Sequence, residues 1–537
     1  MTSQSATQTK KSTPSSRSWT LTFAALVMLA TTLPYLLGFA TQGEGWRFSG
    51  FVFGVEDGNS YIAKMLAGMA GDWLFRTPYS AQPQGGMFAY LPYLLLGKLA
   101  APPGAHEQLV ALFQLFRIAA GMLAILATDD FLSLFVPARN WRRLGLALIT
   151  VGGGLGWVPA LLGRAQWLGS LPLEFYSPES FGFLSLYGLP HLALARALLL
   201  WGLSAYLGEN GKGARAGLLW LLLGLMQPLT VVVAWIVTAA HLSGLALWQM
   251  ARRQAGGWGR WQSFARRAVW AMLLSSPLVI YTAIVFSVDP FFRLWAAQNL
   301  ILSPHPLHYL LAYGVLLPFA FGGTFSLLRE NPWRGWLPII WALLLPFLAY
   351  APYNLQRRLP EGIWAAIVVL GIKGMERWGE GKQKNRGAVF VAFLLFPSSL
   401  LLLAGGLMTA ARPSEPVFQP AAQVSAFRFL AEHARPAEVV LAAYETGNAL
   451  PAWAPLRVVI GHGPESVGLA ELQPRVAAFF RIGSSDSERL TFLQEMDVKY
   501  IFWGPAERAL GDWHPTNAPY LRLVFQEEEV AILAVAP

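Results

Sequence analysis

The fold class is decided by an apolar run near the start of the chain, LTFAALVMLATTLPYLLGFA, which covers residues 21–40. A helix needs about 20 predominantly apolar residues to cross the hydrocarbon core of a bilayer. The run is too long for the core of an ordinary signal peptide, and no clear small-residue cleavage site follows it. We therefore interpret it as a retained first transmembrane helix.

The rest of the chain has the same character. It has 537 residues, of which 55% are hydrophobic and 13% charged, whereas soluble proteins carry about 25% charged residues. Further apolar runs of spanning length predict a polytopic α-helical membrane protein, because a backbone in lipid must satisfy its own hydrogen bonds. The absence of cysteine excludes disulfides, thiolate catalysis and cysteine metal sites.

The basic residues punctuate these apolar runs, so the net charge of +10 is a topology signal and predicts no nucleic-acid partner. They cluster near residues 10–17, 139–143, 212–215, 252–267, 329–334 and 373–386. Placing every cluster in the cytoplasm predicts about eleven spans, with the N-terminus inside and the C-terminus outside. The predicted spans are 20–40, 106–127, 143–162, 189–208, 214–227, 228–250, 268–288, 308–328, 336–351, 361–377 and 388–411.

The composition changes at Arg412. Of the 30 acidic and 40 basic residues in the chain, 15 and 10 lie in residues 412–537. Helical patterns alternate there with short β-rich runs, which predicts a compact extracytoplasmic α/β domain over 412–537. Before it we expect a disordered cytoplasmic tail over 1–18 and a transmembrane domain over 19–411, which includes a first outer loop over 41–104.

Two local patterns interrupt the transmembrane domain. In the first outer loop, Tyr61 and Met65 recur at helical spacing and predict a helix on the bilayer surface, and the apolar segment 87–99 predicts a second interfacial helix. Farther on, Pro228 follows Gln227 and ends a helix there. We expect a hairpin whose tip stops short of the far surface, covered by protein or a cavity.

An acidic pair, Glu56 and Asp57, lies in the stretch GVEDGNSYIAKML, residues 54–66. In one interpretation, Asp57 or Asn59 caps a helix that begins near Ser60, and the carboxylates otherwise face water. In the other, the pair carries out chemistry at the outer membrane surface. The two are compatible, because a capping position would also fix a carboxylate beside the bilayer.

Four arginines lie where topology disfavours them. Arg357 and Arg358, in NLQRRLPEG, fall on the predicted outer side. Adjacent guanidiniums there either bind a lipid phosphate through forked hydrogen bonds or contact headgroups without specificity. Arg117 and Arg196 fall inside predicted spans, where ionisable residues face a cavity or pair with a partner.

The histidines show no metal-ligand pattern. His191 begins a predicted span on its outer side, and His462 lies in a glycine-rich turn, VIGHGPES, of the outer domain. No HExxH or comparable spacing exists, so a divalent cation stays open but has no support in the sequence, and we name no metal ligand. The chain also lacks a P-loop and a GxSxG motif, which leaves ATP-driven transport and serine hydrolase chemistry unsupported.

This layout resembles that of the GT-C glycosyltransferases, and is similar to their bacterial branch labelled dolichyl-phosphate-mannose-protein mannosyltransferase-like. The shared features are an inward N-terminus, an acidic pair in the first outer loop, many spans and an outer α/β domain. The stretch EDGNSYIAKMLAGMAGDWLFRTPYS is similar to their first-loop pattern, with Glu56-Asp57, Tyr61, Gly71-Asp72-Trp73 and Pro78. The next loop offers only Glu174 and Glu179 as a second acidic motif, which disfavours the metal-dependent members.

The resemblance implies a glycosyltransferase of the cytoplasmic membrane, which transfers a sugar from a polyprenyl-phosphate-linked donor at the outer face. Our leading hypothesis is that it inverts the anomeric centre, an outcome that the sequence itself leaves open. Its acceptor would be a cell-envelope glycan, a lipid or a protein. Asp57 would be the catalytic base, with Glu56 as its alternate, and Arg357 and Arg358 would bind the departing phosphate. The other expected substrate contacts are Tyr61, His191, Arg196 and His462.

Two other classes of protein remain open. A transporter or lipid flippase would line a translocation path with Arg117 and Arg196, and would have a tunnel open to both sides. A noncatalytic scaffold of the same fold would keep Glu56 and Asp57 capped, paired or solvated away from any pocket. The direction of the Asp57 carboxylate and of the Arg357 guanidinium would separate these classes.

Overall fold

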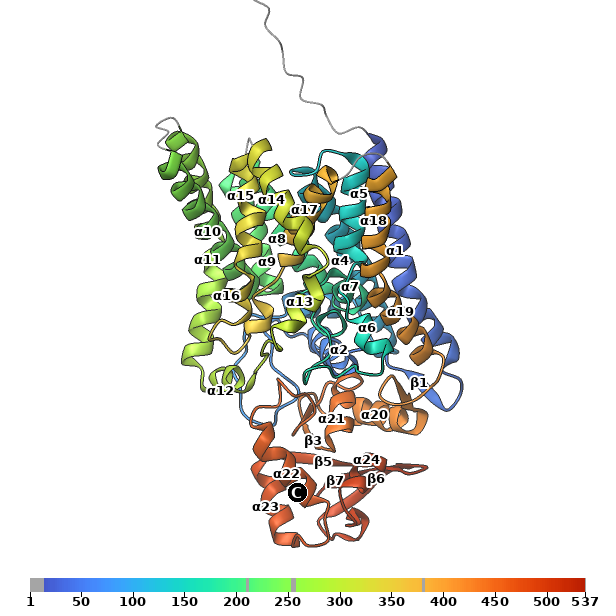
Figure 1. Ribbon diagram of the computed structural model, residues 1–537. Coiled ribbons are helices and arrows are strands. Elements are labelled where there is room, and N and C mark those ends of the chain that lie inside the picture. The colour runs from blue at the N-terminus through green and yellow to red at the C-terminus, as the bar shows by residue number, and fades with distance from the viewer. Residues whose placement is uncertain (1–13, 209–211, 253–256, 379–381, 537) are drawn as a thin grey trace, which may run out of the picture.

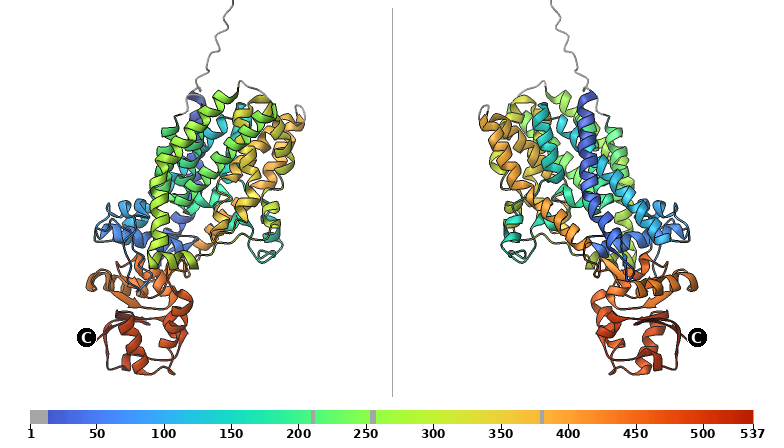
Figure 2. Two further views of the ribbon diagram at one scale, coloured as in Figure 1. Left: turned by 90° about the vertical axis from the view of Figure 1, so that its left-hand side faces the viewer. Right: turned by 90° about the vertical axis from the view of Figure 1, so that its right-hand side faces the viewer.

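The computed structural model describes residues 14–208, 212–252, 257–378 and 382–536. A helical bundle carries a smaller α/β domain at one end (Figure 1). In the side views of Figure 2, the first outer loop lies beside the junction between the bundle and this domain. The predicted tail, 1–18, lies outside the described residues up to residue 13, and α1 begins at Pro14.

The bundle is built from long apolar helices. Of the described helices, six are long and apolar enough to cross a membrane, or seven if the pair α13 and α14, bent by 67°, is one span. The helices are α1 (Pro14–Thr41), α4 (Ala105–Ser133), α5 (Arg139–Val151), α8 (Pro190–Leu207), α9 (Gly213–Met226), α10 (Pro228–Arg252), α11 (Trp258–Val288), α13 (Leu307–Tyr313), α14 (Leu317–Glu330), α15 (Pro332–Leu343), α16 (Leu345–Ala349), α17 (Ile363–Arg377), α18 (Lys382–Leu395) and α19 (Pro397–Ala410). A multi-pass helical membrane protein is confirmed, while the number eleven and the orientation stay predictions.

The core of the bundle surrounds α17. Every residue of this helix from 363 to 375 is buried, and α17 packs against α5, α14 and α15. The predicted break at Gln227 and Pro228 is confirmed, because α9 ends at Met226 and α10 begins at Pro228.

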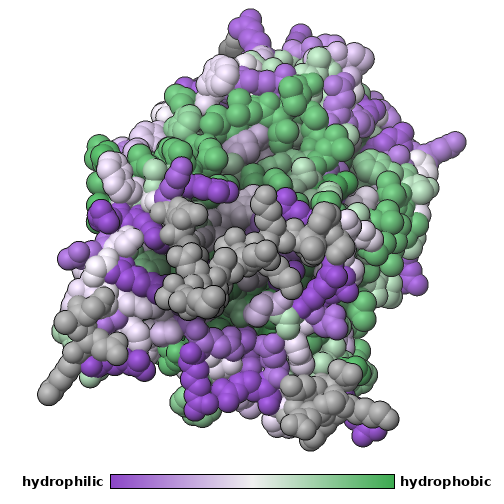
Figure 3. Space-filling model, turned by 90° about the horizontal axis from the view of Figure 1, so that it is seen from above, coloured by the Kyte–Doolittle hydropathy of each residue, from purple (hydrophilic) through white to green (hydrophobic). Residues whose placement is uncertain are grey.

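The two ends of the bundle differ in polarity. Seen from the end opposite the α/β domain, hydrophilic side chains gather around the rim while hydrophobic ones cover the flanks (Figure 3). The helix ends near Arg139, Arg252 and Arg334 lie at this end (Figure 1). The basic residues at these three helix ends therefore share one end of the bundle, and the C-terminal domain occupies the other.

The C-terminal domain contains a five-stranded sheet in the order β4-β3-β5-β7-β6. β3 is parallel to β4 and β5, whereas β7 is antiparallel to β5 and β6. Each β-rich run in the sequence corresponds to one of these strands. The elements are β2 (Phe418–Pro420), α20 (Ala421–His433), β3 (Val439–Leu441), α21 (Tyr444–Ala449), η4 (Leu450–Ala452), β4 (Arg457–Val458), α22 (Leu469–Phe479), α23 (Asp486–Glu495), β5 (Val498–Trp503), α24 (Pro505–Leu510), η5 (Pro515–Asn517), β6 (Leu521–Glu527) and β7 (Val530–Val535).

Segments at this end of the bundle join it to the C-terminal domain. β1 pairs antiparallel with β2, which ties the loop after α1 to the start of that domain. α2 and α3 pack so closely that a Cβ on Gly68 would lie 2.1 Å from the Leu94 carbonyl oxygen. The outer elements are β1 (Trp46–Phe48), α2 (Val55–Met69), α3 (Leu91–Gly97), α6 (Trp157–Leu161), η1 (Leu173–Phe175), α7 (Gly182–Gly188), α12 (Pro290–Gln298) and η3 (Gln356–Arg358).

The position of α2 differs from the sequence-based expectation of a helix on the bilayer surface. Tyr61 and Met65 on its apolar face are buried, and so are Ser60 and Lys64. α2 packs against α3, α4 and α21, so it lies inside protein at the junction. The physical reason is that its polar positions find hydrogen-bonding partners in the C-terminal domain, which the apolar spacing alone cannot reveal.

Candidate functional site

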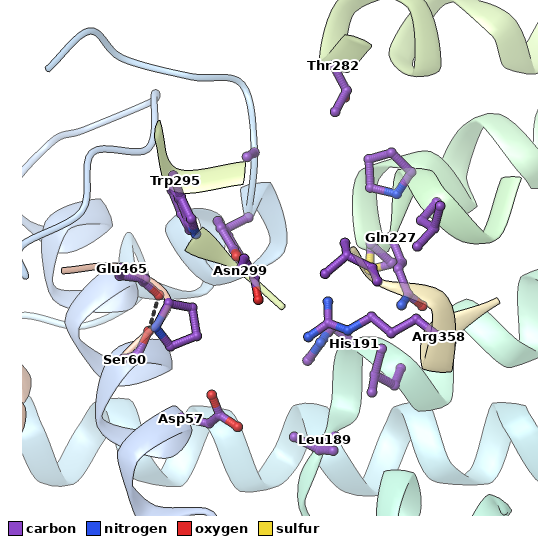
Figure 4. Close-up of a pocket in the computed structure, with 18 of the residues that line it drawn as sticks. Asp57, Ser60, Leu189, His191, Gln227, Thr282, Trp295, Asn299, Arg358 and Glu465 are labelled. Carbon is purple, nitrogen blue, oxygen red and sulfur yellow. Dashed lines mark hydrogen bonds between the residues drawn. The ribbon is translucent and has the colours of Figure 1, made fainter. Parts of the chain in front are cut away.

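A cavity of about 1050 Å³ lies where the bundle meets the C-terminal domain. Its walls come from α2, the loop before α7, the break between α9 and α10, the outer part of α11, the 352–358 segment and the turn 462–465. Figure 4 shows Asp57, Ser60 and Glu465 on one side and His191, Gln227 and Arg358 on the other. Segments far apart in the sequence thus form one polar pocket with apolar walls.

The start of α2 decides how the acidic pair is displayed. Gly54 is the N-cap of α2, and its φ of 56° favours glycine. No side chain forms a capping hydrogen bond at this helix start. The interpretation in which Asp57 or Asn59 caps a helix beginning near Ser60 is therefore wrong, because both lie within the helix. As first-turn residues, Glu56 and Asp57 instead interact favourably with the positive end of the helix dipole.

The two carboxylates point in different directions, because consecutive helical residues are about 100° apart. Asp57 lines the cavity, and its side chain is 56% exposed there. Glu56 does not line it: its carboxylate accepts hydrogen bonds from the Tyr444 hydroxyl and, at 2.9 Å, from the Gly463 N–H. The geometry brings Asp57, and not its alternate Glu56, to the cavity.

His462 of the C-terminal domain contacts Asp57 directly. Its Nε2 lies 3.3 Å from Asp57 Oδ1, and the Ser466 hydroxyl accepts hydrogen bonds from the Gly461 and His462 N–H groups. Enclosure raises the pKa of Asp57, but His462, Arg358 and Lys64 outweigh it and lower the pKa below its usual value. Asp57 is therefore ionised at neutral pH and can accept a proton.

The opposite wall carries the arginine pair. Arg358 lines the cavity and its side chain is 38% exposed, with Nε 3.6 Å from the Glu179 carboxylate. Arg357 also lines the cavity, and its guanidinium lies 4.4 Å from the centre of the Tyr176 ring. Both guanidiniums are thus within one pocket with Asp57, as the sequence predicts for an acid and a phosphate-binding pair.

Two more predicted contacts lie one on each wall: Tyr61 is on α2 with Asp57, and His191 is on the side of Arg358. Tyr61 and His191 both line the cavity. The Tyr93 hydroxyl lies 2.8 Å from His191 Nδ1, and the Tyr61 and Tyr93 rings stack at 4.8 Å. This aromatic support fixes the His191 ring, so its other nitrogen is available to the cavity.

Comparison with known proteins identifies the fold. No protein-family model and no curated protein sequence matches the chain. The oligosaccharyltransferase of Archaeoglobus fulgidus, solved with a tethered acceptor peptide, is 14% identical with a TM-score of 0.51 over 90% of this chain and 69% of that one. The mycobacterial arabinofuranosyltransferase AftD is 15% identical with a TM-score of 0.53 over 96% of this chain and 40% of that one. The fold is that of the GT-C glycosyltransferases. The predicted resemblance is confirmed at the level of the fold.

Within this GT-C fold, two predicted cavity residues turn out to be internal braces. Arg196 does not line the cavity; its Nε pairs with Glu361 at 2.8 Å and its NH2 donates to the Pro178 carbonyl at 2.6 Å. Arg117 donates to Thr31, Thr32 and the Leu186 carbonyl. A buried guanidinium with several donors needs such partners, and here they come from neighbouring segments.

The two candidates for a second acidic motif, Glu174 and Glu179, differ in whether they line the cavity. Glu179 lines the cavity beside Arg358. Glu174 lies outside it and accepts a hydrogen bond from the Gly156 N–H at 2.6 Å. Among the described residues, no group of three or more His, Asp or Glu is placed to hold a metal ion. Asp57 faces cations where further carboxylates would be needed, so these residues do not fit a divalent cation.

Sequence reasoning missed a buried ion pair in the same wall. Lys64 is seven residues after Asp57, hence on the same face of α2, and its Nζ lies 2.6 Å from Glu465 Oε1. Ser60 and Thr77 also donate to Glu465. Burial raises the pKa of Glu465, but Lys64 and its other partners outweigh burial and lower it, so the Glu465 carboxylate is ionised at neutral pH. The signal available in the sequence was the helical spacing of Asp57, Ser60 and Lys64, which places three polar residues on one face of α2.

We expect this pair to hold the C-terminal domain against α2. Lys64→Met should destabilise the protein by about 3–5 kcal/mol, because it leaves the Glu465 carboxylate buried without its counter-ion. The measurement is thermal unfolding in detergent. Arg76→Met, which removes an exposed pair with Asp72 at 3.8 Å, is the matched control and should cost no more than about 1 kcal/mol. Equal melting temperatures of the two variants would contradict the prediction.

Proposed function

We propose that this protein is a membrane glycosyltransferase that transfers a sugar from a polyprenyl-phosphate-linked donor to an acceptor hydroxyl or amide. The observation that carries the proposal is the cavity that holds an ionised Asp57 on one wall and Arg357 and Arg358 on another. Both similar structures of this fold are glycosyltransferases by name. The acceptor class is a cell-envelope glycan, a lipid or a protein.

The reaction follows from the two walls. The acceptor oxygen or nitrogen attacks the anomeric carbon, and the bond from that carbon to the phosphate oxygen breaks. Asp57 takes the acceptor proton, and the electron pair of the broken bond leaves with the phosphate, whose charge Arg358 and Arg357 stabilise. Because Asp57 and Arg358 lie on opposite sides of the cavity (Figure 4), the geometry favours in-line displacement with inversion.

The membrane setting supports a lipid-linked donor. Apolar residues at the start of α10 and the outer end of α11, such as Leu229, Val232 and Phe286, line the same cavity as the arginines. A polyprenyl chain can lie along these helices while its phosphate reaches the polar wall. We place the site at the outer face of the cytoplasmic membrane, because the basic clusters lie at the opposite end of the bundle.

The rival classes receive less support. A transporter would line its path with Arg117 and Arg196, but both are paired away from the cavity. A noncatalytic scaffold would keep the acidic pair away from any pocket; this holds for Glu56 only, since Asp57 faces the cavity.

The test of the proposal compares cells with and without the gene. Mass spectrometry of cell-envelope glycans, lipids and proteins should reveal one class of molecule that lacks a sugar residue in the deletion strain. Purified protein should then restore that residue from a polyprenyl-phosphate-linked donor and release the polyprenyl phosphate. Identical envelope profiles, with no sugar transfer from any lipid-linked donor, would refute it.

The contact of His462 with Asp57 predicts a change in pH dependence. His462 lowers the pKa of Asp57, so His462→Gln should raise it and protonate the base at a higher pH. The acid limb of kcat/KM should therefore move to higher pH, with a smaller loss near pH 8. His433→Gln, an exposed histidine of α20, is the control. An unmoved acid limb in His462→Gln would show that the contact does not tune the base.

A further inference from the structure

The break between α9 and α10 forms part of the cavity wall, so a ligand in the cavity can contact this irregular segment. Gln227 is in extended conformation, with φ −155° and ψ 91°, and residues 224–229 line the cavity. α10 then runs for 25 residues from Pro228. The start of a helix carries a positive dipole end that attracts anions. In α10, Pro228 has no N–H and the Thr230 N–H donates to the Gln227 carbonyl oxygen at 3.1 Å, which leaves the Leu229 N–H for a ligand. By itself this end would not define a site.

The Gln227 side chain supplies the independent observation. Only 7% of the residue is exposed, and its Oε1 accepts a hydrogen bond from the Thr230 hydroxyl at 2.7 Å. That contact orients the amide, so the NH2 group is the part left for the cavity. Among the described residues, no acceptor contacts Gln227 Nε2. The Nε2 group is not fully enclosed but opens into the cavity that Gln227 lines, so an acceptor on a ligand can bind there in place of water.

The charged groups near Gln227 indicate which chemical group of a ligand would accept hydrogen bonds from its amide. In Figure 4 the Gln227 amide lies on the same wall as the Arg358 guanidinium and His191. The carboxylate on this wall, Glu179, is already 3.6 Å from Arg358. Two amide N–H donors, a guanidinium and a helix N-terminus together match the several acceptor oxygens of a phosphate.

We propose that Gln227 and the first turn of α10 bind the phosphate of the lipid-linked donor together with Arg358. This inference rests on the proposed function and adds a binding residue to it. The helix break is then functional: it ends α9 beside the arginine wall and turns the start of α10 toward the phosphate. The apolar residues that follow, Leu229 and Val232, lie where the lipid chain leaves its headgroup.

The test measures the binding of undecaprenyl phosphate to the full-length protein in detergent micelles. Gln227→Leu should weaken binding about tenfold, which corresponds to about 1.4 kcal/mol, and Gln227→Glu should weaken it more, because a carboxylate repels phosphate. Gln249→Leu, the same change at the other end of α10, is the matched control and should bind as wild type does. Undecaprenol, which lacks the phosphate, should bind all four proteins equally.

Further probes separate the sources of phosphate and the two proposals. Inorganic phosphate and phosphatidylglycerol should compete poorly; equal competition by either would overturn a site for the donor lipid. Wild-type affinity in Gln227→Leu alongside a loss in Arg358→Leu would overturn the role of Gln227 and leave the proposed function standing. If wild-type protein bound undecaprenyl phosphate no better than undecaprenol, both the phosphate site and the proposed class of donor would be wrong.

Discussion

Asp57→Asn is expected to lower kcat for sugar transfer about a thousandfold while the protein stays folded. An amide cannot take the acceptor proton, and general base catalysis contributes about 10²–10⁴ in rate. The substitution keeps the shape of the side chain and an oxygen that can accept from His462 Nε2, 3.3 Å away in the wild type. The measurement is single-turnover transfer from a lipid-linked donor, in membranes with matched protein levels.

Glu56→Gln is the control for that variant. The glutamine oxygen can still accept from the Tyr444 hydroxyl and the Gly463 N–H, and the side chain lies outside the cavity lining. We expect kcat to remain near the wild-type value. A large loss in Glu56→Gln with normal transfer by Asp57→Asn would reverse the assignment of the base.

Arg358→Leu should produce the second-largest effect, a loss of about 10²–10³ in kcat/KM. A cationic donor that stabilises the charge on a leaving oxygen contributes on this scale, and Arg358 projects into the cavity from η3 (Figure 4). Arg358→Lys should recover part of the loss, because it restores charge without the forked donor geometry. Initial rates at several donor concentrations give the separate changes in kcat and KM.

Arg357→Leu is the matched comparison, since it removes the adjacent guanidinium. That group lies over the Tyr176 ring, which already engages its face, so we expect a smaller loss than for Arg358→Leu. If Arg357→Leu were the more damaging variant, Arg357 would be the main phosphate ligand. If neither variant changed kcat/KM, the arginine pair would not bind the leaving group.

The candidate site shows which of the predicted residues the structure brings together, while their roles in substrate binding and catalysis stay predictions. Asp57, Arg357, Arg358, His191 and Tyr61 were predicted from local motifs and all line one cavity. The role expected for Arg196 was not found, because its partners come from other loops. A single sequence shows that an arginine in a span needs a partner, but it does not show whether that partner is a ligand or another residue.

By itself, the sequence determined the class of the protein and the order of its parts. Apolar runs such as 21–40 must become helices in a membrane, because each backbone group has to be satisfied within its own segment. The break at Gln227 and Pro228 and the strands of the C-terminal domain follow equally from local rules. These features depend on residues that are neighbours in the chain.

Only the tertiary structure decided which carboxylate serves the cavity and what surrounds it. Beginning α2 at Gly54 sets the helical phase, and that phase turns Asp57 inward and Glu56 toward the C-terminal domain. His462 and Glu465 then reach Asp57 and Lys64 across about 400 residues of sequence, as contacts at separations of 405 and 401 show. Such long-range contacts depend on how whole domains pack. The pattern of residues along one sequence does not show which distant residues lie close together in space.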